Sequence, residues 1–126
     1  MNDLPPFELG YPRTELRRQL VDAVLRGEKT ATAGLLEEYE AEGETPEPPG
    51  ARCALLGYND EPVAVVEVTE TRIVPAGEID EQFARDEGEG FESVEDWRVA
   101  HESFFGRNLT PETAIVATRF RVVERL

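Results

Sequence analysis

Apolar residues along the chain recur with the periods of both helices and strands. Leu16, Leu20 and Val24, each four residues apart, predict a helix over 12–26, and Gly27 can end it. Three further helices are expected from similar patterns, over 34–42, over 78–87, and from Ser93 to Gly106. The last of them carries an apolar stripe: Val94, Trp97, His101 and Phe104 or Phe105.

Three segments show the alternation of side chains that is typical of strands. The strands expected at 51–57 and 62–74 are separated by the polar turn 58–61, which predicts a hairpin. The clearest strand is expected at 113–124, where Thr118 shares one face with alternating apolar residues.

Length and element order together predict the fold class. The chain has 126 residues, of which 40% are hydrophobic, and this suits one domain over 1–126. Residues 1–11 precede the first expected helix as an N-terminal extension, and the proline-rich stretch 44–50 is expected to be an extended loop. Helices and strands alternate without βαβ repeats. We therefore expect an α+β fold, a small, mixed, mostly antiparallel sheet or barrel flanked by helices.

The chain is strongly acidic, with a net charge of −14. This argues against a general nucleic-acid binder, because non-specific binding depends on neutralising phosphates. The charge is uneven, since 37–47 holds six glutamates and no base, and 78–96 holds nine acids and one arginine. In contrast, 13–29 holds five bases, and three arginines lie in 119–126. If these basic segments meet in space, a local basic surface remains.

Neither a membrane nor an export route is indicated. No apolar run approaches the ~20 residues of a membrane span, and the N-terminus lacks the basic and apolar regions of a signal peptide. The only cysteine, Cys53, cannot form an internal disulfide, and its apolar neighbours predict a small buried thiol. We therefore expect a cytoplasmic protein with no membrane partner.

Lys29 is the only lysine among thirteen basic residues, and the other twelve are arginines. An amine can lose its proton when desolvated, whereas a guanidinium effectively cannot. Thr32 follows three residues later, so its hydroxyl and the amine can approach one another. Lys29 could then activate Thr32 as a nucleophile, or stay charged and stabilise an anion beside it. The residues leave both alternatives open.

Other chemistries find less support. The stretch 27–30 resembles part of a P-loop, but it lacks the earlier glycine and follows a helix instead of a strand. One histidine and one cysteine make no metal-ligand set, so we expect neither a metal nor a cofactor. His101 is either a packed, hydrogen-bonded histidine or a catalyst. Helical spacing turns the aromatic residues around it inward, away from any base-stacking role.

Several motifs, taken in order, resemble the ASCH domain (activating signal cointegrator homology), a relative of the PUA fold. They are Gly27-x-Lys29-x-x-Thr32, the strand 65–69, the segment 83–90, Trp97-Arg98-x-x-His101-x-x-Phe104-Phe105, and the strand 115–120. Together they cover roughly residues 15–125. The resemblance implies a β-barrel core, helices that close a cleft, and a link to RNA or nucleosides.

One branch of the family hydrolyses the amide of N4-acetylcytidine to cytidine and acetate, which implies Lys29, Thr32 and Glu87 as catalytic residues. Thr32 would attack the carbonyl with the help of Lys29, and Glu87 would pass a proton to the departing amine. The acidic neighbours Asp86 and Glu89 are expected to raise the proton affinity of Glu87. The same motifs supply the candidates for substrate binding: Gly27, Thr30, Glu67, Trp97, His101 and Arg119.

The resemblance also implies two alternatives. Another branch is described as a ribonuclease, for which His101 and Lys29 could serve in phosphate chemistry. A non-catalytic RNA-binding module would use the basic helix face and the terminal strand. The expected partner is thus a modified nucleoside or RNA, and the net charge favours the neutral nucleoside. The helix with His101 is longer here than in the compact amidohydrolases, which leaves the substrate open. The oligomeric state is not predicted.

Overall fold

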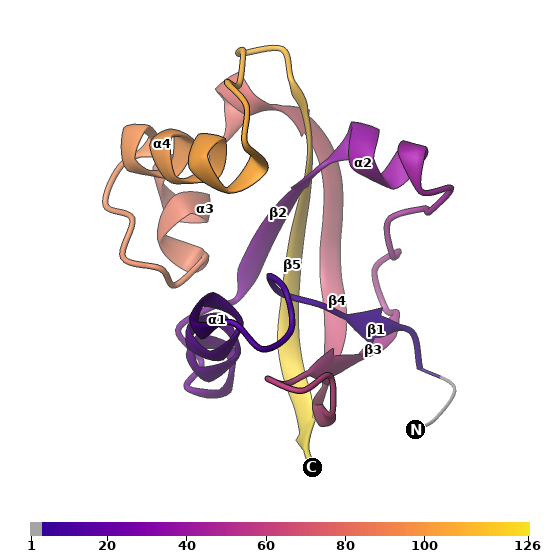
Figure 1. Cartoon of the computed structure of the whole chain (residues 1–126). Coiled ribbons are helices and arrows are strands. Elements are labelled where there is room, and N and C mark those ends of the chain that lie inside the picture. Colours follow the sequence, from indigo (N-terminus) through magenta and orange to yellow (C-terminus); the bar gives the residue numbers. More distant parts are fainter. Residues whose placement is uncertain (1–3) are drawn as a thin grey trace.

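The computed structural model describes residues 4–126, which form one five-stranded sheet with four α-helices around it (Figure 1). The strands lie in the order β1-β3-β4-β5-β2, and only the β1–β3 pair is parallel. The edge strands β1 and β2 do not pair with each other, so the sheet is open and does not close into a barrel. The α+β class and the mixed, mostly antiparallel sheet are confirmed. The elements are β1 (Pro6–Phe7), α1 (Glu15–Leu25), β2 (Ala31–Leu35), α2 (Leu36–Ala41), β3 (Arg52–Leu56), β4 (Pro62–Pro75), a 3-10 turn (Ala76–Glu78), α3 (Glu81–Asp86), α4 (Val94–Phe105) and β5 (Ala114–Arg125).

The predicted helix over 34–42 is wrong in its first part. Residues Ala31–Leu35 form the edge strand β2, and α2 begins only at Leu36. Five consecutive residue pairs bind β2 to β5. The local sequence shows no strand pattern, so pairing with a distant strand overrides the local preference. In the same way, the N-terminal extension supplies β1, which pairs with β3.

Side-chain caps set the starts of three helices. The Oγ atoms of Thr14 and Ser93 each accept a hydrogen bond, 3.1 Å long, from the backbone N–H three residues on. The predicted helix over 78–87 starts later than expected, after Asp80, whose carboxylate caps α3 at 2.8 Å. Gly106 ends α4 with φ 71°, which glycine adopts without strain. Within residues 4–126, no helix is both long and apolar enough to span a membrane.

Two apolar clusters pack on the two faces of β5. On one face, α1 packs against β3, β4 and Phe120. On the other, α3 and α4 pack against β2 and against Ile115 and Ala117. Alternate residues of a strand face opposite ways, which separates these two sets. Val116 and Thr118 share the face of Phe120, but they line a cleft that lies beyond the first cluster.

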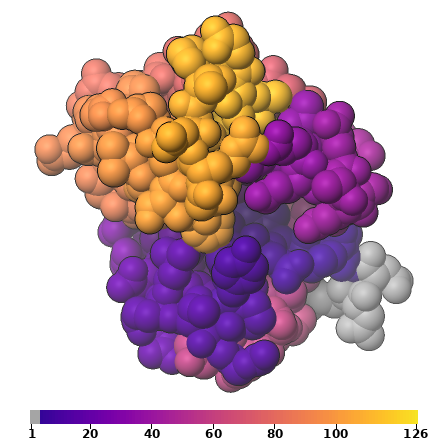
Figure 2. Space-filling view, turned by 45° about the horizontal axis from the view of Figure 1, so that its top comes forward, coloured from indigo at the N-terminus to yellow at the C-terminus, as the bar shows by residue number. Residues whose placement is uncertain are grey.

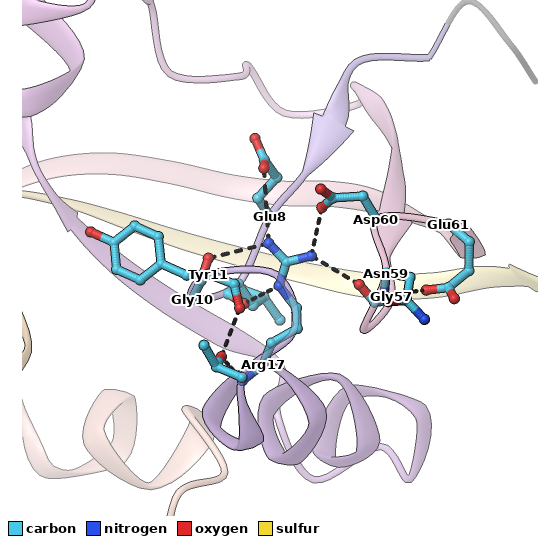
Figure 3. A network of polar contacts seen from close by, with 10 residues as sticks. Glu8, Gly10, Tyr11, Arg17, Gly57, Asn59, Asp60 and Glu61 are labelled. Atoms are coloured by element: carbon cyan, nitrogen blue, oxygen red, sulfur yellow. Dashed lines mark hydrogen bonds and ion pairs between the residues drawn. The ribbon is translucent and has the colours of Figure 1, made fainter.

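Arg17 on α1, expected on a basic helix face, is instead fully buried, with 0% of its surface exposed. Its guanidinium donates to the carbonyl oxygens of Leu9 at 2.7 Å and Gly57 at 2.9 Å, and to the carboxylate of Asp60 at 3.0 Å (Figure 3). These bonds join the N-terminal segment, α1 and the β3–β4 turn. Residues 6–12 of that segment line the cleft, so Arg17 holds one of its walls in place.

Candidate functional site

A cleft of about 710 Å³ opens between the N-terminal segment, α2 and α4. Figure 2 shows the surface hollowed where the orange, purple and indigo segments meet. This volume lies within the ~300–1,000 Å³ of typical small-molecule sites. The sheet contributes the floor, with Thr32, Gly34, Val68, Val116 and Thr118.

Lys29 lines this cleft, and only 1% of its side chain is exposed. Its Nζ donates to the carbonyl oxygens of Ala31 at 2.9 Å and Glu87 at 3.1 Å. A third hydrogen bond, 3.2 Å long, goes to Oε2 of Glu89. Three acceptors match the three donors of an ammonium group. Of the two alternatives for Lys29, the geometry therefore favours the charged amine over the neutral base.

A close backbone contact brings the end of α3 against the segment that carries Lys29. The N–H of Thr30 donates to the carbonyl oxygen of Asp86 at 2.7 Å. Gly88 has φ +69°, and a Cβ there would lie 2.7 Å from the Cα of Lys29. Only glycine fits this conformation and this approach. Gly88 thus lets Glu87 lie beside Lys29, although the two are far apart in sequence.

Glu87 has 1% of its surface exposed and is surrounded by donors. Its Oε2 accepts a hydrogen bond from the indole Nε1 of Trp97. Its Oε1 lies 3.3 Å from Nε2 of His101 and 3.6 Å from Nζ of Lys29. Burial is the strongest single influence on the pKa of Glu87 and raises it, but His101, Lys29 and Trp97 together outweigh burial. The pKa of Glu87 therefore lies below its usual value, and the carboxylate is ionised.

The prediction that Asp86 and Glu89 raise the proton affinity of Glu87 is wrong. Asp86 forms an ion pair with Arg119 at 2.6 Å, and neither residue lines the cleft. Glu89 is paired with Lys29 at 3.2 Å. Both neighbouring charges are thus largely neutralised, and the donors that surround Glu87 decide its protonation state.

His101 is both packed and part of the polar site. Its ring stacks on Trp97, with centroids 4.3 Å apart, and it also lines the cleft. Its Nδ1 lies 2.8 Å from the carbonyl oxygen of Trp97, which can only accept, and its Nε2 faces the carboxylate of Glu87. Both nitrogens therefore donate. Burial lowers the pKa of His101, but the contacts with Glu87 outweigh burial and raise it overall.

Thr32 and Thr118 are directly opposite each other on β2 and β5. Opposite residues of antiparallel strands share a face, with Cβ atoms about 5 Å apart. Both threonines line the cleft, and neither hydroxyl makes a hydrogen bond to another residue of the described part of the chain. Sequence reasoning did not select Thr118 as a functional residue. The available signal was its hydroxyl on the apolar face of β5 shared with Val116 and Phe120.

The residues predicted to bind substrate are divided between the cleft and other parts of the molecule. His101 lines the cleft. Trp97 donates a hydrogen bond to Glu87. Glu67 forms an ion pair with Arg121 at 2.9 Å. The other five predicted residues do not line the cleft: Gly27, Thr30, Glu67, Trp97 and Arg119. That they contact a bound substrate stays a prediction.

Comparison with known proteins agrees with this fold. An ASCH domain from Lactobacillus crispatus is 26% identical, with a TM-score of 0.81 over 96% of this chain and 80% of that chain. A protein from Enterococcus faecalis is 25% identical, with the same TM-score of 0.81 over 96% of this chain and 77% of that chain. A hypothetical protein that is 16% identical, with a TM-score of 0.64 over 94% and 99% of the two chains, shares the fold alone.

None of the curated proteins with which the sequence was compared matches it. The family model of the ASCH domain, however, matches residues 9–124, which is almost the whole chain. The motifs around Lys29 and His101 that resembled this family all lie within the match. The chain therefore belongs to the ASCH domain family.

Proposed function

We propose that this protein is an amidohydrolase that cleaves the N4-acyl amide of a modified cytidine such as N4-acetylcytidine. The observation that supports it best is the buried ammonium of Lys29, 3.6 Å from the carboxylate of Glu87, in a cleft that Thr32 also lines. These are the three residues to which the family resemblance assigns amide hydrolysis. Acyl transfer needs an ammonium, a carboxylate and a hydroxyl, and these three residues supply them. Of the three groups, only the hydroxyl of Thr32 has no hydrogen-bond partner among the described residues.

In the proposed reaction, the hydroxyl oxygen of Thr32 bonds to the amide carbon while its proton passes to the carboxylate of Glu87. The ammonium of Lys29, whose three N–H groups bond protein acceptors, stabilises through its positive charge the negative charge that develops on the carbonyl oxygen. The carbon–nitrogen bond then breaks as Glu87 gives its proton to the departing amine, which leaves an acyl ester on Thr32. Water attacks this ester, gives a proton to Glu87 and releases the carboxylic acid, and Glu87 returns the proton to the oxygen of Thr32.

The protonation state of Glu87 fits this role. A proton acceptor must be ionised before the attack, and the pKa of Glu87 is lowered below its usual value although burial alone raises it. His101 donates to the same carboxylate, 3.3 Å away, and keeps it ionised. We assign His101 as a positioning residue because it acts through Glu87.

Charge favours a neutral nucleoside over the two RNA alternatives. Both the RNA-binding module and the ribonuclease need cations that meet phosphates. Arg119 and Arg121 on the terminal strand are engaged with Asp86 and Glu67 at 2.6 and 2.9 Å. Among the described residues, the cleft is lined by seven glutamates and no arginine. A polyanion is repelled from such a site.

The direct test is turnover of N4-acetylcytidine by purified protein, followed by chromatography of released cytidine. We expect Thr32→Val to lower kcat at least about a thousandfold, because the nucleophile is removed. Lys29→Arg is expected to abolish turnover while the circular dichroism spectrum stays native. The matched control, Thr69→Val, alters an exposed threonine of β4 outside the cleft and should leave the rate unchanged.

The 5′-monophosphate of N4-acetylcytidine extends this test to charge. We expect its kcat/KM to be lower than that of the nucleoside and to rise with salt, which screens repulsion from the acidic cleft. If Thr32→Val hydrolyses the nucleoside at the wild-type rate, Thr32 is not the nucleophile and the proposal fails.

A further inference from the structure

In Figure 1, α2 lies across the molecule from α4. The side of the cleft that α2 and the following loop form carries an excess of negative charge. Four glutamates on α2 and the following loop line it, and within residues 4–126 none of their side chains forms an ion pair with a basic residue. At the other end of the cleft, Lys29 lies within 3.6 Å of both Glu87 and Glu89. The four glutamates without a cationic partner, called the acidic wall below, are Glu38, Glu42, Glu44 and Glu47.

An aromatic ring lies among these carboxylates. Tyr39 lines the cleft and rests on the floor, because a Cβ at Gly34 would be 3.2 Å from Cε1 of its ring. Burial raises the pKa of Tyr39, and the four glutamates of the acidic wall raise it further. Glu44 also has a raised pKa, because it shares a hydrogen bond with Glu42 and is repelled by it. The acidic wall is thus a region of negative potential around one tyrosine ring.

A second group in the same cleft lacks a partner. Thr118 has only 9% of its surface exposed, lines the cleft, and makes no hydrogen bond through its hydroxyl to the described residues. It lies two residues along β5 from Val116, which is directly opposite Gly34 under the ring of Tyr39. Side chains two apart on a strand share a face, so the hydroxyl and the ring belong to one continuous surface.

The chemistry of this surface selects an organic cation. Within residues 4–126, no three His, Cys, Asp or Glu side chains are grouped closely enough to hold a metal ion. Dispersed carboxylates around an aromatic face instead suit an alkylammonium group, which gains from the ring and from the negative potential. We propose that the acidic wall and Tyr39 form a binding site for the ammonium group of a small-molecule ligand, and that the hydroxyl of Thr118 bonds a polar group of the same ligand.

This site does not depend on the proposed hydrolysis, because binding is measured without turnover. Spermidine, which carries three ammonium groups, is the probe for isothermal titration calorimetry at 150 mM salt. We expect saturable binding of one spermidine per chain and at least tenfold weaker binding of Mg²⁺. Loss of N4-acetylcytidine turnover and loss of spermidine binding are therefore read in separate assays, and either can occur without the other.

Two variants and one control separate local recognition from long-range attraction. Tyr39→Leu is expected to weaken spermidine binding about tenfold through loss of the cation–ring contact. Glu42→Gln/Glu44→Gln, in an exposed loop, is expected to weaken it at least tenfold. The control Glu112→Gln/Glu124→Gln changes the net charge equally, at residues that do not line the cleft, and should stay within twofold of wild type. Equal losses in the two double variants, or no saturation at millimolar spermidine, would overturn the proposal.

Discussion

Replacing Glu87 with glutamine removes one buried negative charge and keeps the shape of the side chain. The amide oxygen can still accept the hydrogen bond from Nε1 of Trp97. The amide nitrogen can donate to Nε2 of His101, but only when that nitrogen carries no proton. Lys29 loses the carboxylate at 3.6 Å and keeps Glu89 at 3.2 Å. The variant therefore retains its hydrogen bonds with a neutral imidazole.

The expected loss of stability follows from the burial of these partners. Removing one member of a buried ion pair costs about 3–5 kcal/mol. Because Glu89 remains beside Lys29, we place the loss near the lower end, about 3 kcal/mol at pH 6. That is a large part of the ~5–15 kcal/mol by which domains of this kind are stable.

The loss should depend on pH in a direction that the two pKa shifts determine. The raised pKa of His101 means that its contribution is complete below the unfolded value near ~6.5 and is lost as pH rises through the folded pKa. The lowered pKa of Glu87 gives a contribution that is present above ~4.3 and lost on acidification. Wild-type stability should therefore fall above pH ~6.5, and the difference between wild type and Glu87→Gln should shrink with it.

Urea unfolding at pH 6 and pH 8.5 measures the stabilities, and NMR measures the cause. The chain contains one histidine, so the C2–H resonance of the untagged protein reports His101 alone. In Glu87→Gln we expect its pKa to move below the usual value, because burial remains and the carboxylate is gone. Glu112→Gln, at an exposed site, is the control. An unchanged His101 titration in Glu87→Gln would refute the coupling between these two residues.

Three further predictions concern the framework of the cleft. Arg17→Met should lower the free energy of unfolding in urea by about 3–5 kcal/mol, because it leaves buried acceptors unpaired. Arg18→Met, at an exposed position of the same helix, should change it little. Similar losses in the two variants would contradict the role of Arg17 as a buried clamp that joins α1 to the N-terminal segment. Gly88→Ala should lower the free energy of unfolding clearly more than Gly27→Ala in the same assay. Both glycines have positive φ, but of the two only Gly88 would place a Cβ within 4 Å of other backbone atoms. Equal losses would show that the backbone around Lys29 can move to accommodate a Cβ. Burial raises the pKa of Cys53 to about 11, so the native thiol should not react with a thiol reagent at pH 8 and should react fully in urea; rapid native reaction would mean that β3 opens.

Local sequence patterns predicted most of the helices and strands. The hairpin of β3 and β4, the strand β5, and α1 and α4 lie close to their expected bounds, because each has a periodic apolar face of its own. The strand β2 has no such pattern, since only pairing with β5 makes it a strand. Leu16 and Phe104 were expected to face inward, yet they are 37% and 47% exposed and line the cleft. Apolar periodicity predicts which face of a helix points toward the interior of the molecule. It does not predict whether that face contacts the core or lines a cleft.

The features of the candidate site can likewise be separated into those that the sequence predicts and those that only the structure shows. The sequence by itself determined that one amine stands out, that a hydroxyl follows it at short range, and that ordered motifs belong to the ASCH domain family. Only the tertiary structure decided which carboxylates meet that amine, that His101 and Lys29 keep Glu87 ionised, and that Arg17 is a buried clamp. Burial and the nearest charges decide the protonation state of a group, and both arise from segments as far apart as Lys29 and His101. The sequence therefore identifies the candidate reactive groups, and the folded structure determines which of them are charged.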